Sequence, residues 1–98
     1  MAQPTHESGR IHIYVTGRVQ GVGFRAFVQH TAVELGLCGW VRNVGYNQVE
    51  TIAEGSPQVL DHFLEAVRTG PRGARVNGSN FNWEIPLGEF KAFEIRFY

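Results

Sequence analysis

The order of its hydrophobic periodicities constrains the fold of this chain more than any other feature. Apolar residues recur every three or four positions in two segments, which predicts helices over about 24–35 and from Ser56 to Gly70. Strand-forming residues, partly in alternation, predict five strands, over about 11–16, 38–44, 49–54, 81–85 and 93–98. The order β-α-β-β-α-β plus an extra strand predicts an α+β fold, the ferredoxin-like split β-α-β sandwich.

The two predicted helices each carry a single apolar stripe. Both should therefore cover one face of an antiparallel sheet, with the other face partly open to water. Residues 72–80 are rich in Gly, Arg, Asn and Ser and predict a loop. We expect residues 1–10 to form a flexible N-terminal lead-in to a single domain over 11–98.

The charge balance restricts the kind of partner. The chain of 98 residues has 9 Lys plus Arg and 9 Asp plus Glu, whereas a nucleic-acid-binding domain is usually strongly basic. No apolar run approaches the about 20 residues of a membrane helix, and residues 1–10 lack the apolar core of a secretion signal. We expect a cytoplasmic monomer with neither a nucleic-acid nor a membrane partner.

The segment Gly17–Arg25 is the strongest indication of chemistry. It leaves a predicted strand and enters a predicted helix, where backbone N–H groups lack helical partners and the helix dipole is positive. Its glycines allow several N–H groups to converge on an anion, which predicts a phosphate site. Arg25 opposes the dipole at this position unless an anion lies between them, and its planar fork suits phosphate oxygens.

Three other phosphate or nucleotide patterns fit less well. Gly21-x-Gly23-x-x-Ala26 matches a dinucleotide fingerprint, but the acidic partner expected about 20 residues later is missing. A P-loop needs Gly-Lys-Ser/Thr, whereas Phe24 follows Gly23. An RNA-recognition module shares the predicted element order, but its stacking aromatics belong on the third strand, not at the start of the first helix.

Two motifs together resemble the acylphosphatase family. They are Gly17-x-Val-Gln-Gly21-Val-Gly23-Phe24-Arg25 and Gly39-Trp40-Val41-Arg42-Asn43, and the resemblance extends over 11–98. It implies metal-free hydrolysis of the carboxyl–phosphate bond of a small-molecule acyl phosphate, with no cofactor. Inorganic phosphate would be product and competitive inhibitor.

The resemblance also implies the site residues. Arg25 would grip the phosphate, and Asn43 would hold the attacking water. The implied phosphate-binding amides are those of Gln20, Gly21, Val22, Gly23, Phe24 and Arg25. The family often has a Gly-containing pair where this chain has Asn47-Gln48, so a shifted hairpin turn would alter the aim of Asn43.

A second hypothesis is a module that keeps the fold and binds phosphate or a carboxyl-phosphate ligand without turnover. The resemblance also implies degenerate copies of this domain inside larger maturation proteins. The presence of both Arg25 and Asn43 favours the enzyme. RNA binding is the third hypothesis, and the zero net charge argues against it.

Several other polar or aromatic residues are assigned no chemistry. The four histidines, His6, His12, His30 and His62, have no common metal spacing, so no metal is expected. Cys38 is expected to be an inert thiol, and Arg72 and Arg75 to form a solvated basic loop. Trp40, Phe81 and Trp83 are expected in the core, in preference to an exposed aromatic face for partners. Strand alternation places Arg42 on the opposite sheet face from Asn43.

Overall fold

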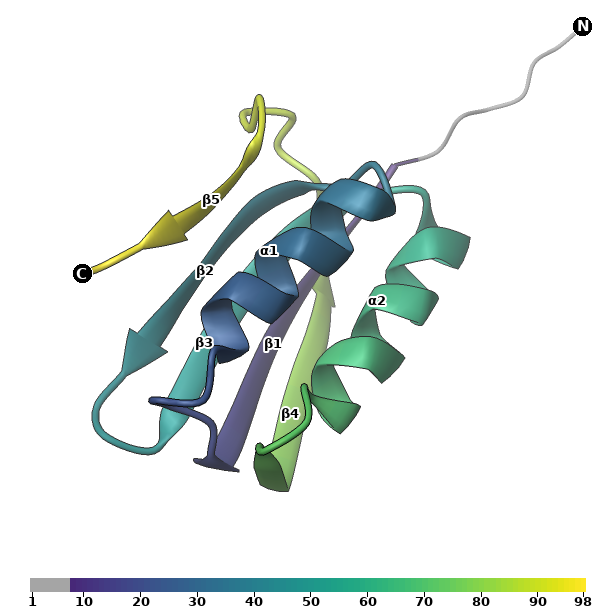
Figure 1. Ribbon diagram of the computed structural model, residues 1–98. Coiled ribbons are helices and arrows are strands. Elements are labelled where there is room, and N and C mark those ends of the chain that lie inside the picture. Colours follow the sequence, from purple (N-terminus) through teal and green to yellow (C-terminus); the bar gives the residue numbers. More distant parts are fainter. Residues whose placement is uncertain (1–7) are drawn as a thin grey trace, which may run out of the picture.

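The computed structural model describes residues 8–98 as a five-stranded sheet with two helices on one face (Figure 1). The elements are β1 (Gly9–Arg18), α1 (Phe24–Glu34), β2 (Cys38–Val44), β3 (Gln48–Gly55), α2 (Pro57–Thr69), β4 (Arg75–Glu84) and β5 (Phe93–Arg96). The order in the sheet is β4-β1-β3-β2-β5. The predicted α+β ferredoxin-like sandwich is confirmed.

The sheet is mixed, whereas the sequence predicted an antiparallel one. β1, β2, β3 and β4 pair antiparallel, but β5 runs parallel to β2. The cause is the connection over 85–92, which leads from β4 at one edge to β5 at the other. Its amides at Leu87 and Gly88 donate to the carboxylate of Glu54, at 2.9 and 3.1 Å, which ties the connection to β3.

The core lies between the helices and the sheet. Ile11, Ile13 and Val15 of β1 are fully buried, and they face the buried stripes of both helices. Full burial of such side chains contributes about 1.5–3 kcal/mol each. Val19 and Phe24, which flank the glycine loop (residues 20–23), are 0% and 2% exposed. The loop is therefore anchored in the core at both ends.

The boundaries of β1 and β4 differ from the prediction. β4 begins at Arg75, inside the predicted loop, and pairs with β1 along its whole length. Its polar, Gly-containing sequence lacks the apolar alternation by which strands are predicted, because an exposed edge strand does not need that alternation. β1 begins at Gly9, within the predicted lead-in, and the rest of that lead-in except Ser8 lies outside the described residues.

The predicted core aromatics have different environments. Trp40 is 8% exposed, as expected, but Phe81 and Trp83 are 40% and 47% exposed, so that part of the prediction is wrong. Both lie on β4, at the edge of the sheet. The sheet face without helices is partly open to water, as predicted, and His12, Tyr14 and Arg42 are half-buried there.

Candidate active site

The glycine loop connects β1 to the N-terminus of α1. Gly21 and Gly23 have φ of 74° and 77°, the left-handed conformation that favours glycine. Gly23 is the N-cap of α1, and among residues 8–98 no side chain caps this helix. The first N–H groups of α1 therefore remain available to an anion.

A pocket of about 210 Å³ opens beside this loop. Its lining residues are Val19, Gln20, Gly21, Gly23, Phe24, Arg25, Ala26, Asn43, Ile95 and Phe97. The pocket thus contains both residues predicted to be catalytic and four of the other predicted phosphate-binding positions. Val22 is not part of the lining, and its side chain packs against the core.

Arg25 projects from the first turn of α1. Its guanidinium carbon Cζ lies 4.8 Å from the centre of the Phe97 ring, a cation–π contact. Within the part of the chain that the structure describes, Arg25 has no carboxylate partner. Its N–H donors are therefore free for an anionic ligand.

Asn43 reaches the same pocket from β2. Its partner in the ladder is Val49 of β3, and the pairing stays regular up to Val44 and Gln48 at the turn. Arg42 points to the other face of the sheet, where it bonds Glu50, as strand alternation predicted. Over residues 8–98 the amide of Asn43 makes no side-chain hydrogen bond, so its polar atoms are available in the pocket.

The side chain of Gln20 has a role that the sequence analysis missed. Its amide nitrogen lies 3.3, 3.1 and 3.0 Å from the main-chain oxygens of Val44, Gly45 and Gln48 and donates to them. It thereby joins the glycine loop to the β2–β3 turn, next to Asn43. No local pattern predicts this contact, because it depends on how the glycine loop packs against a turn 24 to 28 residues farther along the chain.

The displaced turn glycine fits the hairpin. Gly45 has φ of 60°, so the turn uses glycine at a left-handed position. The amide of Gly17 also donates to the main-chain oxygen of Asn47 at 2.9 Å. A Cβ atom at Gly17 would overlap the main-chain oxygen of Arg75, so this position requires glycine. The turn is thus fixed to both β1 and the glycine loop.

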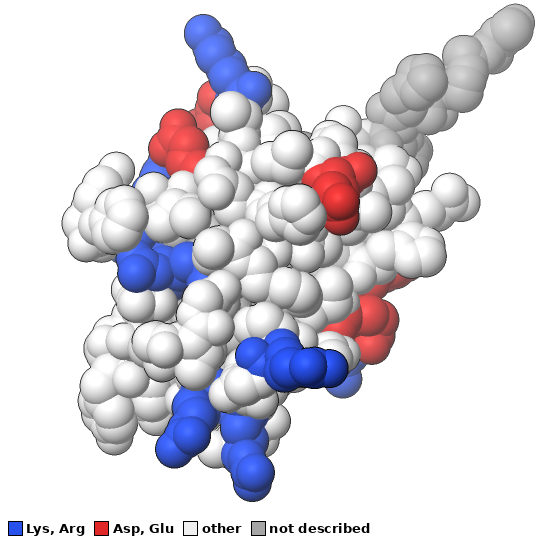
Figure 2. Space-filling model, in the orientation of Figure 1, with Lys and Arg blue, Asp and Glu red and all other residues white. Residues whose placement is uncertain are grey.

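Positive charge gathers at the glycine-loop end of the molecule. Figure 2 shows arginine side chains at the lower end of this face, where Figure 1 places the loop between β1 and α1 and the start of β4; the single lysine of the chain, Lys91, belongs to the segment before β5 at the other end. Arg18 and Arg75 lie opposite each other in the β1–β4 ladder. A local positive field attracts anions although the whole chain is neutral.

Cys38 and the described histidines lie outside the pocket lining. Among residues 8–98 no group of three His, Cys, Asp or Glu side chains could hold a metal ion. His30 and His62 lie exposed on the helices, and His6 lies outside the described residues. Burial, together with the charge of Glu54, raises the pKa of the Cys38 thiol, which disfavours the reactive thiolate. No described helix is long and apolar enough to span a membrane.

Similarity to known proteins extends along nearly the whole chain. The acylphosphatase family model matches residues 11–95. An acylphosphatase from Syntrophotalea carbinolica is 47% identical over 88 residues, which are 90% of this chain and 96% of that relative. The crystal structure of acylphosphatase from Bacillus subtilis has a TM-score of 0.85 at 40% identity and covers 90% of this chain and 98% of that one. HypF from T. kodakarensis has a TM-score of 0.77 at 34% identity, but the match covers only 12% of its chain.

Proposed function

This chain belongs to the acylphosphatase family and is an enzyme of that kind, and from that premise we propose how its own residues act. The reaction is metal-free hydrolysis of the carboxyl–phosphate bond of an acyl phosphate, which gives a carboxylate and inorganic phosphate. One observation carries the proposal: Arg25, Asn43 and the glycine loop line a single pocket.

The glycine loop and Arg25 bind the phosphoryl group. The loop supplies backbone N–H groups at a helix N-terminus, and Arg25 adds a planar fork of N–H donors. Since Arg25 has no carboxylate partner among residues 8–98, it pays no cost of breaking an ion pair when phosphate enters. Four of the proposed phosphate contacts come from Gln20, Gly21, Gly23 and Phe24.

The leaving group explains why so few side chains suffice. A carboxylic acid has a pKa of about 4, so the carboxylate leaves without being protonated and no general acid is needed. The phosphoryl group passes through a loose transition state with charge on its equatorial oxygens. The preorganised donors of the loop and Arg25 stabilise that charge.

Asn43 orients the attacking water. Its side-chain oxygen accepts a hydrogen bond from that water and aims the water oxygen at phosphorus. As the water oxygen bonds to phosphorus and the bond to the carboxylate oxygen breaks, one proton stays on the attacking oxygen and the other passes to another oxygen of the phosphate. Gln20 acts one step away, because its bonds to Val44, Gly45 and Gln48 hold the turn that follows Asn43.

The test is hydrolysis of benzoyl phosphate by the purified chain, with and without a metal chelator and with inorganic phosphate as competitor. We expect turnover that the chelator leaves unchanged and that phosphate inhibits competitively. A folded chain that binds phosphate without turnover would contradict the enzyme and indicate a binding module. Turnover lost with the chelator would contradict the metal-free mechanism.

A further inference from the structure

We propose that Arg42 is a positioning residue for the phosphate site, acting from the opposite face of the sheet. Glu50 holds the side chain of Arg42 in place, and Arg42 in turn fixes residues 97–98, which follow β5. Phe97 in this segment orients the guanidinium of Arg25. The inference rests on the proposed phosphate-binding role of Arg25.

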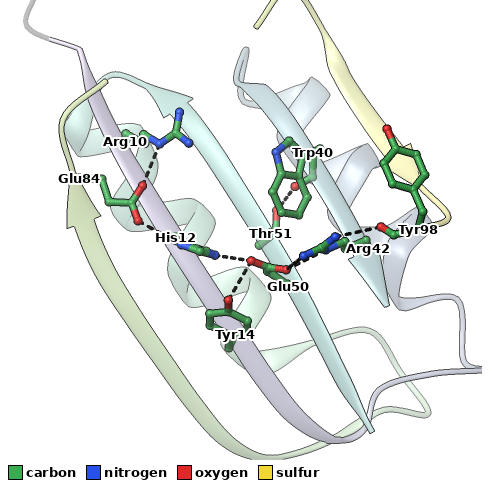
Figure 3. Close-up of polar contacts among 9 residues, drawn as sticks. All are labelled: Arg10, His12, Tyr14, Trp40, Arg42, Glu50, Thr51, Glu84 and Tyr98. Carbon is green, nitrogen blue, oxygen red and sulfur yellow. Dashed lines mark hydrogen bonds and ion pairs between the residues drawn. The ribbon is translucent and has the colours of Figure 1, made fainter. Parts of the chain in front are cut away.

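Glu50 holds Arg42 in one place (Figure 3). Nε and Nη2 of Arg42 both lie 2.8 Å from Oε1 of Glu50. The side chain of Glu50 is 5% exposed, and its second oxygen Oε2 lies 2.6 Å from Nε2 of His12 and 2.9 Å from the hydroxyl of Tyr14. Cζ of Arg42 also lies 5.2 Å from the centre of the Trp40 ring. Arg42 is therefore restrained on several sides.

The free end of the Arg42 fork holds the segment after β5. Its Nη1 donates to the main-chain oxygen of Tyr98 at 3.0 Å (Figure 3). The β2–β5 ladder ends at the pair Arg42 and Arg96, so this bond extends the attachment to β2 beyond the ladder. Phe97 lies within this extension and is 79% exposed, so burial contributes little to its placement.

Phe97 acts on the opposite face from Arg42. It continues the face of Phe93 and Ile95, which point toward the helices, and its ring lines the pocket. The ring contacts the Arg25 guanidinium at 4.8 Å. A guanidinium stacked on a ring keeps its N–H edge free for oxygen ligands, so the stack orients Arg25 without blocking it. Such preorganisation strengthens anion binding by reducing the ordering cost.

The test compares Arg42→Gln with the matched control Arg10→Gln. Arg10 lies on the same face and is paired with Glu54 and Glu84 at 2.8 and 2.9 Å, but it contacts neither the pocket nor the segment after β5. We expect calorimetric titration with inorganic phosphate to show about two- to fivefold weaker binding for Arg42→Gln, the range for loss of an exposed cation–π contact. Arg10→Gln should bind phosphate as the parent does, although it lowers the melting temperature.

Two further measurements separate positioning from general loosening. In the parent, ring current from Phe97 should shift the NMR signal of the Arg25 Nε–H upfield, and Arg42→Gln but not Arg10→Gln should remove the shift. In a double-mutant cycle, Phe97→Leu should weaken phosphate binding to the same degree, and adding Arg42→Gln should have no further effect. If Arg42→Gln does not fold, Arg42→Lys serves instead, because one ammonium cannot bond Glu50 and Tyr98 with the geometry of the fork.

Unchanged phosphate binding in the folded Arg42 variant would overturn the inference. So would equal losses in Arg42→Gln and Arg10→Gln, or additive losses in the cycle. A parent chain that binds phosphate but does not hydrolyse benzoyl phosphate would contradict the proposed function alone, and the phosphate titrations would still test the inference.

Discussion

On the sheet face without helices, Arg10 and Arg42 donate to carboxylates that are nearly buried, whereas Arg25 in the pocket stacks on an aromatic ring. The two paired arginines have their charge compensated within the protein and serve the architecture. Arg25 has no such compensation among residues 8–98, and its counter-charge is left to a ligand. The comparison shows that the partner of an arginine, rather than its exposure, distinguishes a structural guanidinium from a ligand-binding one.

Replacing the arginine in the pocket should have the largest effect on activity. We expect Arg25→Ala to lower kcat/KM for benzoyl phosphate by at least about 100- to 1,000-fold, as for loss of one preorganised oxyanion donor. Arg25→Lys should be similarly impaired, since an ammonium lacks the planar fork. Steady-state kinetics beside Arg10→Gln tests the comparison, which fails if the Lys variant retains near-parental activity.

Asn43→Ala should lower turnover by about 100-fold through loss of water orientation, with phosphate affinity nearly unchanged. The measurement is kcat together with the inhibition constant for inorganic phosphate. Loss of phosphate binding along with turnover would instead make Asn43 a phosphate ligand.

Gln20→Ala should lower kcat by up to about tenfold, which matches the net contribution of one or two hydrogen bonds. The reason is that the β2–β3 turn loses its tie to the glycine loop. The matched control is Gln48→Ala, because within the described residues 8–98 the Gln48 side chain bonds only Thr16, at 3.4 Å, near the same turn. An equal loss of kcat in both variants would contradict this explanation, because it would show that any disturbance of the β2–β3 turn lowers kcat, whether or not the tie to the glycine loop is kept.

Acid should lower the free energy of unfolding, because it protonates Glu50 on the sheet face without helices. Burial alone would raise the pKa of Glu50, but hydrogen bonds from His12, Arg42 and Tyr14 outweigh it and lower that pKa. A carboxylate with a lowered pKa stabilises the fold above the unfolded-state pKa of about 4.3, and this stability is lost as the pH falls through the folded-state pKa. Urea unfolding between pH 7 and pH 3 should show this loss.

The matched variant for the acid effect is Glu50→Gln, which removes the titrating group. Its free energy of unfolding should be lower at neutral pH and should fall less steeply with acid. A parallel pH dependence in parent and variant would assign the acid effect to other carboxylates. Glu54 is the next to examine, because amides of Leu87 and Gly88 and the Arg10 guanidinium lower its pKa despite burial.

The predictable parts of the molecule were those encoded locally. The glycine loop and Arg25 lie within one short segment, and the helices follow from their apolar spacing. Asn43 was named through the resemblance of a second motif to the acylphosphatase family, and the pocket brings it to Arg25, although nothing in the local sequence pattern determines that approach. Residue chemistry alone was therefore sufficient to name Arg25 but not Asn43, and only the fold brings the two together.

The parts that could not be predicted depend on pairing between distant segments. The bond from Arg10 to Glu84 joins residues 74 positions apart, and it exists only because β4 lies next to β1 in one register. The contact of Phe97 with Arg25 likewise depends on β5 reaching the far edge of the sheet. The start of β4 was missed because an edge strand tolerates a loop-like composition.

The short edge strand β5 has a consequence for the dynamics of the pocket. It has four residues and, in the part of the chain that the structure describes, pairs with β2 alone, so its local opening requires less free energy than unfolding of the whole domain. Such opening would remove Ile95 and Phe97 from the pocket while the buried residues of β1 and α2 stayed packed. The affinity for anions would then depend on fraying of one strand, and it could be lost by a fluctuation that measurements of global stability do not detect.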